Sequence, residues 1–138
     1  MEEVIMEELI NKYRGQQRAP STTCCFTMLL EWVDTEDSRN ALESIAGRFK
    51  TIRGAKRVLP QILNHPDLDS FMLANSVELI DPYFMQDGDL LVVDGSHSLI
   101  YHCGYLFGVT GSTEIFEYLE VNTVLNAKNH KQAYRKIK

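Results

Sequence analysis

Apolar residues follow a helical spacing through the first half of the chain. In residues 2–13 they recur on one face with acidic residues opposite, which predicts an amphipathic helix. Residues 24–33 are almost entirely apolar, so we expect a helix buried on most sides. Further helices are predicted over residues 38–46, from after Thr51 to about Ile62, and over residues 67–75. Pro60 lies inside the second of these and is expected to shorten or kink it.

The pattern changes from helical to extended after Ser76. Short apolar runs bounded by turn residues are typical of strands. They predict strands over residues 77–80, 90–93, 98–107 and 113–119, with a final extended or helical piece near residues 133–137. Helices followed by an antiparallel sheet define the α+β class. We therefore expect N-terminal helices packed on a small C-terminal antiparallel sheet.

The length of 138 residues fits one domain, with a helical part over about residues 1–75 and a sheet part over about residues 76–138. Apolar residues make up 44% of the chain and charged residues 24%, which are values of a globular protein and argue against a disordered or fibrous chain.

Charge narrows the choice of partners. The chain has 14 basic and 19 acidic residues, a net charge of −5, which opposes attraction to phosphate backbones. We therefore expect no nucleic acid partner, and we interpret the basic residues after position 127 as a solvated segment. No apolar run approaches the length of a membrane span. The acidic N-terminus is unlike a secretory signal, so synthesis in the cytoplasm without a signal peptide is expected.

The chain has three cysteines, and two of them are candidates for a catalytic nucleophile. Cys24 and Cys25 are adjacent and the number is odd, which is a poor framework for disulfides and indicates a reducing compartment. Ser21, Thr22 or Thr23 could cap the helix that follows, which places both thiols at its start. A helix N-terminus favours a thiolate and offers N–H groups to an oxyanion. From position alone, either cysteine could be the nucleophile.

Histidines supply a possible base. If residues 98–107 form one strand, His102 shares a face with Ile100 and Gly104, and a thiolate on the opposing helix would satisfy its imidazole. His97 is interpreted instead as a surface turn residue. A zinc site from Cys24, Cys25, His102 and Cys103 would need the fold to bring these residues together. No glycine-rich phosphate loop is present, and no cofactor is expected.

The order of these motifs resembles a known family. Cys25 at the head of an apolar helix, then Gly88-Asp89 before an apolar run, then His102-Cys103-Gly104-Tyr105, is similar to the NlpC-type branch of papain-like cysteine peptidases. Those are cell-wall endopeptidases of bacteria and phages. The stretch from Arg48 to Ala55 and the later Asp87-Gly88-Asp89 are more narrowly similar to short phage proteins encoded among tail genes.

The resemblance implies a Cys25 nucleophile, a His102 base and a third polar residue that orients the imidazole. That third residue falls near Thr113 or Glu114, of which Glu114 is the better orienter because a carboxylate stabilises imidazolium. The family commonly has Asp before its cysteine and Ser or Ala after it. Here Cys24 and Phe26 occupy those positions.

Two functions follow as expectations from the resemblance. The first is hydrolysis of peptide bonds in bacterial peptidoglycan by a protein carried in the virion at the tip of a phage tail. The second is an inactive papain-like fold that serves as a structural or assembly component of that tail tip. The expected partners are accordingly peptidoglycan peptides or other tail-tip proteins.

Overall fold

The computed structural model describes residues 6–19, 24–95, 97–109 and 115–137. Its first half is helical, as expected: α1 (Met6–Tyr13), α2 (Cys25–Val33), α3 (Glu36–Ile45), α4 (Ile52–Leu63) and α5 (Leu68–Ala74). The second half holds β1 (Val77–Ile80), the 3-10 helix η1 (Pro82–Phe84), β2 (Leu90–Val93), β3 (His97–His102), β4 (Tyr105–Gly108), β5 (Glu117–Glu120), α6 (Val121–Asn126) and β6 (Lys131–Lys136). The expected α+β arrangement is confirmed.

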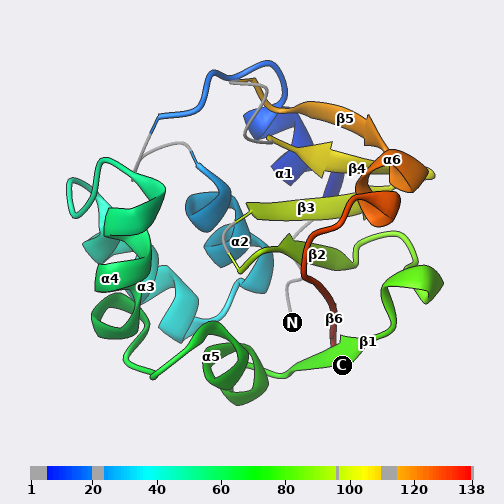
Figure 1. The fold of residues 1–138 in the computed structure, drawn as a ribbon. Coiled ribbons are helices and arrows are strands. Elements are labelled where there is room, and N and C mark those ends of the chain that lie inside the picture. Colours follow the sequence, from blue (N-terminus) through cyan, green and yellow to red (C-terminus); the bar gives the residue numbers. More distant parts are fainter. Residues whose placement is uncertain (1–5, 20–23, 96, 110–114, 138) are drawn as a thin grey trace.

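The strands form one sheet in the order β1-β6-β2-β3-β4-β5, with antiparallel pairing throughout (Figure 1). The C-terminal piece is thus a strand, β6, inserted between β1 and β2. Pro60 does not end α4, which continues to Leu63. The short helix α6 was not predicted from the sequence.

The prediction of one long strand over residues 98–107 is wrong. The chain reverses after His102, because Cys103 and Gly104 have φ angles of 52° and 83° and form a two-residue turn. Positive φ at both turn residues matches the twist of a hairpin. Tyr105 therefore pairs back onto His102. Gly104 lies in the turn and does not extend the face that carries His102.

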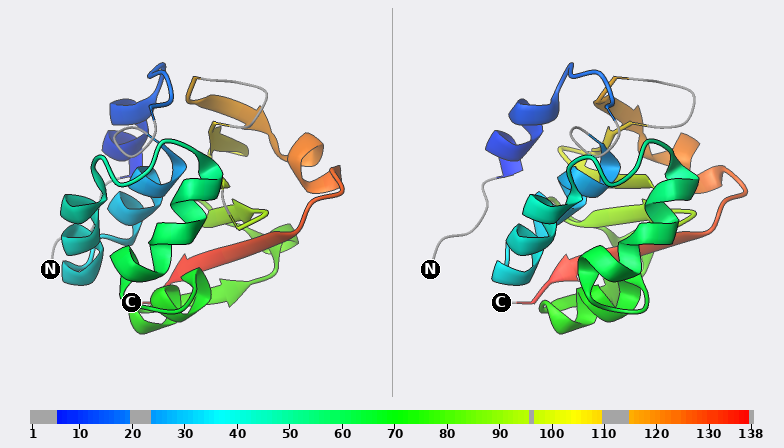
Figure 2. Two further views of the ribbon diagram at one scale, coloured as in Figure 1. Left: turned by 60° about the vertical axis from the view of Figure 1, so that its left-hand side comes forward. Right: turned by 90° about the vertical axis from the view of Figure 1, so that its left-hand side faces the viewer.

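Alternate residues of the sheet enter two separate hydrophobic cores. Leu90, Ile100, Phe107 and Tyr134 face α1 to α5 and belong to the larger core. On the other face lies a smaller core made by Leu91, Leu99, Leu106, Ala133, Met85 and, from α6, Leu125. Figure 2 shows α6 on the side of the sheet opposite α2 to α5. Both faces of the central strands are therefore covered.

Helix α2 is the central element, packed against α1, α3 and β3. Met28 and Trp32 are fully buried. At its C-terminal end, Trp32 Nε1 donates to the Gly88 carbonyl at 2.7 Å. At its N-terminal end, the Ser98 hydroxyl donates to the Cys25 carbonyl at 2.6 Å. These two hydrogen bonds place the start of α2 beside the start of β3, and the end of α2 beside the start of β2.

Asp89, a residue of the Gly-Asp motif, stabilises the framework of the sheet. It is 3% exposed and accepts from Arg135 Nε at 3.0 Å and Arg135 Nη2 at 2.7 Å. Its carboxylate also accepts from the Gln86 N–H at 2.7 Å. A paired and hydrogen-bonded carboxylate is the form in which a buried charge is tolerated. Asp89 therefore ties β6 to the start of β2.

Candidate functional site

Cys25 is the first residue of α2, and Cys24 is the N-cap residue. The Thr27 hydroxyl accepts from the Cys24 N–H at 2.9 Å and donates to the Cys24 carbonyl at 2.8 Å, which holds the first turn. The expectation that residue 21, 22 or 23 is the cap is therefore wrong, and those residues lie outside the described ones. The N–H groups of Cys25 and Phe26 fall in the first turn, where a helix has no carbonyl of its own to receive them.

The structure places an imidazole beside the Cys25 thiol, and it belongs to His97. Cys25 Sγ and His97 Nδ1 are 4.0 Å apart. The thiol also lies 3.6 Å from the Val109 carbonyl, to which it donates. His97 is the first residue of β3 and is half-buried. The sequence-based interpretation of His97 as a surface turn residue is therefore wrong.

Burial raises the pKa of the Cys25 thiol to about 11. The side chain is removed from water, which penalises the thiolate, and the nearby Cys24 acts in the same direction. A backbone hydrogen bond from Ser98 and the positive charge of Arg18 oppose this rise. The thiol is thus neutral at physiological pH.

Arg18 and Gly108 complete the surroundings of the thiol. Arg18 supplies a positive charge that favours the thiolate. A Cβ on Gly108 would lie 2.4 Å from Leu99 Cδ2 and 2.8 Å from the Ser98 carbonyl. Glycine at this position therefore allows β4 to approach β3 next to the serine that contacts Cys25. Neither residue was singled out from the sequence.

The prediction that His102 faces Cys25 is wrong. His102 is four residues beyond Ser98 on β3, a separation of roughly 13 Å along a strand. It lies next to Tyr101, whose carbonyl accepts from the Gly88 N–H at 2.8 Å, at the Trp32 end of α2. Its own partners are Tyr118 Oη, 3.0 Å from Nδ1, and Cys103 Sγ, 3.8 Å from Nε2.

The remaining predicted site residues have mixed outcomes. Glu114, like Thr113, lies outside the described residues. Cys24 is buried and serves as the N-cap, while the described imidazole contact is made by Cys25. His97 could have been found from the order of motifs alone, because it also follows Gly88-Asp89 and begins the next strand. The apolar pattern around His102 is the stronger local signal in the sequence.

The described residues hold no group of three or more His, Cys, Asp or Glu side chains that could bind a metal ion. The zinc alternative would need Cys24 and Cys25 to meet His102 and Cys103, which lie at opposite ends of β3. Across the helices of the described part of the chain, none has the length and apolar character of a membrane span.

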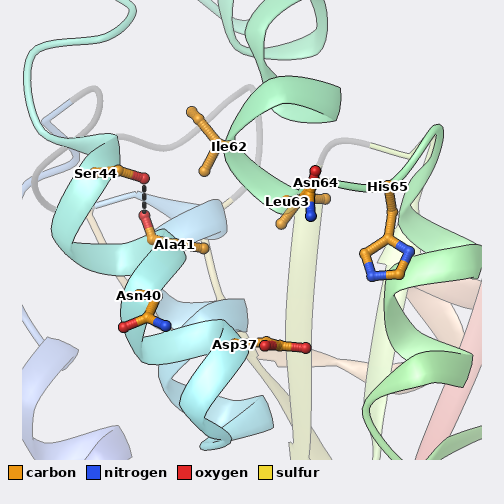
Figure 3. Close-up of a pocket in the computed structure, with 8 residues that line it drawn as sticks. All are labelled: Asp37, Asn40, Ala41, Ser44, Ile62, Leu63, Asn64 and His65. Carbon is orange, nitrogen blue, oxygen red and sulfur yellow. Dashed lines mark hydrogen bonds between the residues drawn. The ribbon is translucent and has the colours of Figure 1, made fainter.

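A hollow of about 340 Å³ lies between α3 and the C-terminal end of α4 (Figure 3). Polar side chains of Asp37, Asn40, Asn64 and His65 line it together with apolar groups such as Ile62. It contains neither Cys25 nor His97. We therefore take the Cys25 thiol and the His97 imidazole at the start of α2, and not this hollow, as the candidate site.

Comparison with known proteins gives one partial match and one match over most of the chain. The chain is similar to the cobyric acid synthase of Mycolicibacterium vanbaalenii, with 37% identity over 82 residues, covering 54% of this chain and 16% of that protein. No solved structure matches. The family described as "Domain of unknown function (DUF6950)" matches residues 3–135. On that match, the chain belongs to the DUF6950 family.

Proposed function

We propose that the protein is a cysteine hydrolase of amide bonds, with Cys25 as the nucleophile and His97 as the base. The observation that carries this proposal is the 4.0 Å separation of Cys25 Sγ and His97 Nδ1 at the first turn of a helix. A base must reach its proton directly or through one water, and such contacts are often long in the absence of substrate. His97 meets this requirement, whereas His102 does not.

The Cys25 proton passes to His97 Nδ1 as the sulfur attacks the substrate carbonyl carbon. The oxyanion that forms is stabilised by first-turn N–H groups and the helix dipole. When the carbon–nitrogen bond breaks, the leaving amine takes the proton from His97 and a thioester remains on Cys25. Water, deprotonated by His97, cleaves the thioester, releasing the carboxylic acid and restoring the thiol.

The raised pKa of Cys25 decides between two forms of this mechanism. A resting thiolate–imidazolium pair needs a depressed thiol pKa, whereas burial raises it to about 11. Proton transfer to His97 therefore accompanies attack on the substrate. The positive charge of Arg18 favours the thiolate as it develops.

The substrate we propose is a peptide of bacterial peptidoglycan, and the setting is a phage tail tip. Both come from the resemblance to NlpC-type peptidases, whose motif order is kept when His97 takes the place of His102. The net charge of −5 agrees with a partner other than nucleic acid.

The first test uses a small acyl donor and does not depend on the natural substrate. Native protein carrying Cys103→Ser is mixed with 4-nitrophenyl acetate, and peptide mapping by mass spectrometry locates the acetyl group. We expect acetylation of Cys25 to fall at least about a hundredfold in His97→Ala. His102→Ala, a change on the same strand, is the matched control and should stay within about twofold. Acetylation independent of His97 contradicts the proposed base.

The second test uses purified peptidoglycan sacculi and measures the release of new amino groups and soluble peptides. We expect release by the wild type and loss in Cys25→Ser and His97→Ala. Acetylation of Cys25 without release from sacculi would contradict the proposed substrate while leaving the nucleophile in place. Circular dichroism confirms that each variant is folded.

One observation favours the alternative of an inactive structural component. Cys25 is 5% exposed, and its thiol already donates to the Val109 carbonyl. In this alternative the cysteine is a packing residue of the core, as buried cysteines commonly are. Cys25→Ser would then leave the protein's assembly into tail tips unchanged, and the wild type would show no acetylation of Cys25.

A further inference from the structure

We propose that Cys103 is a second reactive thiol, a solvent-facing site that exchanges with small disulfides and is activated by His102. Cys103 is exposed, whereas Cys24 and Cys25 are each 5% exposed, and all three thiols are free. It occupies the first position of the turn between β3 and β4, with a φ of 52°. This proposal is independent of the hydrolase proposal, because it uses different residues at the other end of β3.

The thiol has an imidazole beside it. His102 Nε2 lies 3.8 Å from Cys103 Sγ. The other ring nitrogen, Nδ1, lies 3.0 Å from the Tyr118 hydroxyl. His102 is half-buried, and its ring is stacked on that of Tyr118 with an interplanar angle of 23°. The imidazole is therefore held from both sides, with one nitrogen directed at the thiol.

The surroundings fix both members of this pair. The Cys103 N–H donates to Asp87 Oδ1 at 2.9 Å, which anchors the turn. Tyr118 packs edge-on against Phe107, with ring centroids 5.3 Å apart, and Arg14 lies 5.2 Å from the centroid of Tyr118. Because Phe107 belongs to the buried core, Tyr118 is positioned by the fold. His102 is in turn positioned by Tyr118.

The hydrogen-bond donors and acceptors of Tyr118, His102 and Cys103 allow the imidazole to exchange a proton with the thiol. When the Tyr118 hydroxyl accepts from Nδ1–H, the lone pair of Nε2 faces the thiol and can take its proton. When the hydroxyl donates to Nδ1, Nε2–H can donate to the thiolate. The imidazole can thus take the thiol proton or donate to the thiolate, which is the form that attacks a disulfide.

The exchange step balances with one external disulfide. The Cys103 proton passes to His102, and the thiolate attacks one sulfur of the disulfide. A new sulfur–sulfur bond forms to Cys103 while the original one breaks, and the leaving thiolate takes the proton from His102. The disulfide is the oxidant. The product is a mixed disulfide, because Cys24 and Cys25 are buried in the larger core and do not share this surface.

The test follows native full-length protein in oxidised glutathione at neutral pH, with intact mass and peptide mapping against time. We expect one glutathione adduct, on Cys103, formed at least about tenfold faster than on the same cysteine in urea. Cys103→Ser should abolish the adduct. Modification of Cys25 in preference to Cys103, or a disulfide-linked dimer in place of the adduct, would overturn the proposal.

The role of His102 is tested with a matched pair of histidine variants on one strand. His102→Ala should slow the formation of the adduct at least about fivefold and change how its rate depends on pH. His97→Ala should change neither the rate nor the pH profile. Tyr118→Phe keeps the ring and removes the hydroxyl, so a smaller slowing is expected even if His102→Ala fails to fold. Equal rates in the wild type and both His102→Ala and Tyr118→Phe would show that the imidazole plays no part.

Discussion

Two pairs of cysteine and histidine lie at opposite ends of β3, and their environments differ. Cys25 with His97 is in the core at the first turn of α2, with the sulfur and Nδ1 4.0 Å apart. Cys103 with His102 is at a hairpin turn, with the sulfur and Nε2 3.8 Å apart and the thiol exposed. The separations are similar. What distinguishes the pairs is burial and the elements that position them.

This difference suits different chemistry at the two ends of the strand. The buried thiol is neutral at rest, is shielded from small oxidants, and gains first-turn N–H groups that suit an acyl transfer. The exposed thiol has no helix N-terminus, but disulfides can reach it. On the two proposals made above, the same two residue types serve a hydrolytic site at one end of β3 and an exchange site at the other.

The largest expected contrast is in alkylation of the native protein. At pH 8, iodoacetamide should modify Cys25 at least about a hundredfold more slowly than Cys103, because raising the pKa of Cys25 from 9.0 to about 11 lowers its thiolate fraction about that much. Burial of the sulfur acts in the same direction. The measurement is quantitative peptide mapping against time.

In urea, the alkylation rates of the two cysteines should converge to within a few fold, which serves as the control. Fast labelling of Cys25 in the native protein would indicate a resting ion pair with His97 and contradict the mechanism of a neutral thiol. Slow labelling of both cysteines would contradict the activation of Cys103 by His102.

The next effect is a loss of stability at alkaline pH. The folded chain keeps the Cys25 proton up to about pH 11, whereas the unfolded chain releases it near 9.0. Unfolding therefore releases a proton between these values, and stability falls as pH rises through them. The free energy of unfolding at pH 10 is therefore expected to be about 1.4 kcal/mol lower than at pH 8. Burial also raises the pKa of Tyr13 and Tyr134, which adds a loss above pH 10.

The variant Cys25→Ser measures how much of this alkaline loss of stability comes from the Cys25 thiol. Urea unfolding at pH 8 and pH 10 should show a loss that is smaller in this variant by about 1.4 kcal/mol. Cys103→Ser is the matched exposed variant and should show the same loss as the wild type. An identical pH dependence in wild type and Cys25→Ser would contradict the raised thiol pKa.

Much of the fold could be predicted from the sequence, because the helices and β1 and β2 depend on local periodicity. The hairpin at Cys103 could not, since Cys103 resembles a strand residue until its positive φ is known. The same turn explains why the prediction of His102 as the partner of Cys25 is wrong. One long strand over residues 98–107 predicts that His102 faces the helices near Cys25. The direction of α2, however, depends on distant contacts such as that of Trp32 with Gly88. Such tertiary contacts leave no local pattern in the sequence.

The smallest expected effect compares one hydrogen bond at each end of β3. The Ser98 hydroxyl is 1% exposed and donates to the Cys25 carbonyl at 2.6 Å, so Ser98→Ala should lower the free energy of unfolding by about 1 to 2 kcal/mol. Asp87 is exposed and accepts from the Cys103 N–H, which water can satisfy instead, so Asp87→Ala should cost less than about 0.5 kcal/mol. Urea unfolding with unchanged m-values measures both. A cost for Asp87→Ala equal to that for Ser98→Ala would mean that the turn at Cys103 is held as firmly as the start of α2, and the two ends would then differ in exposure alone.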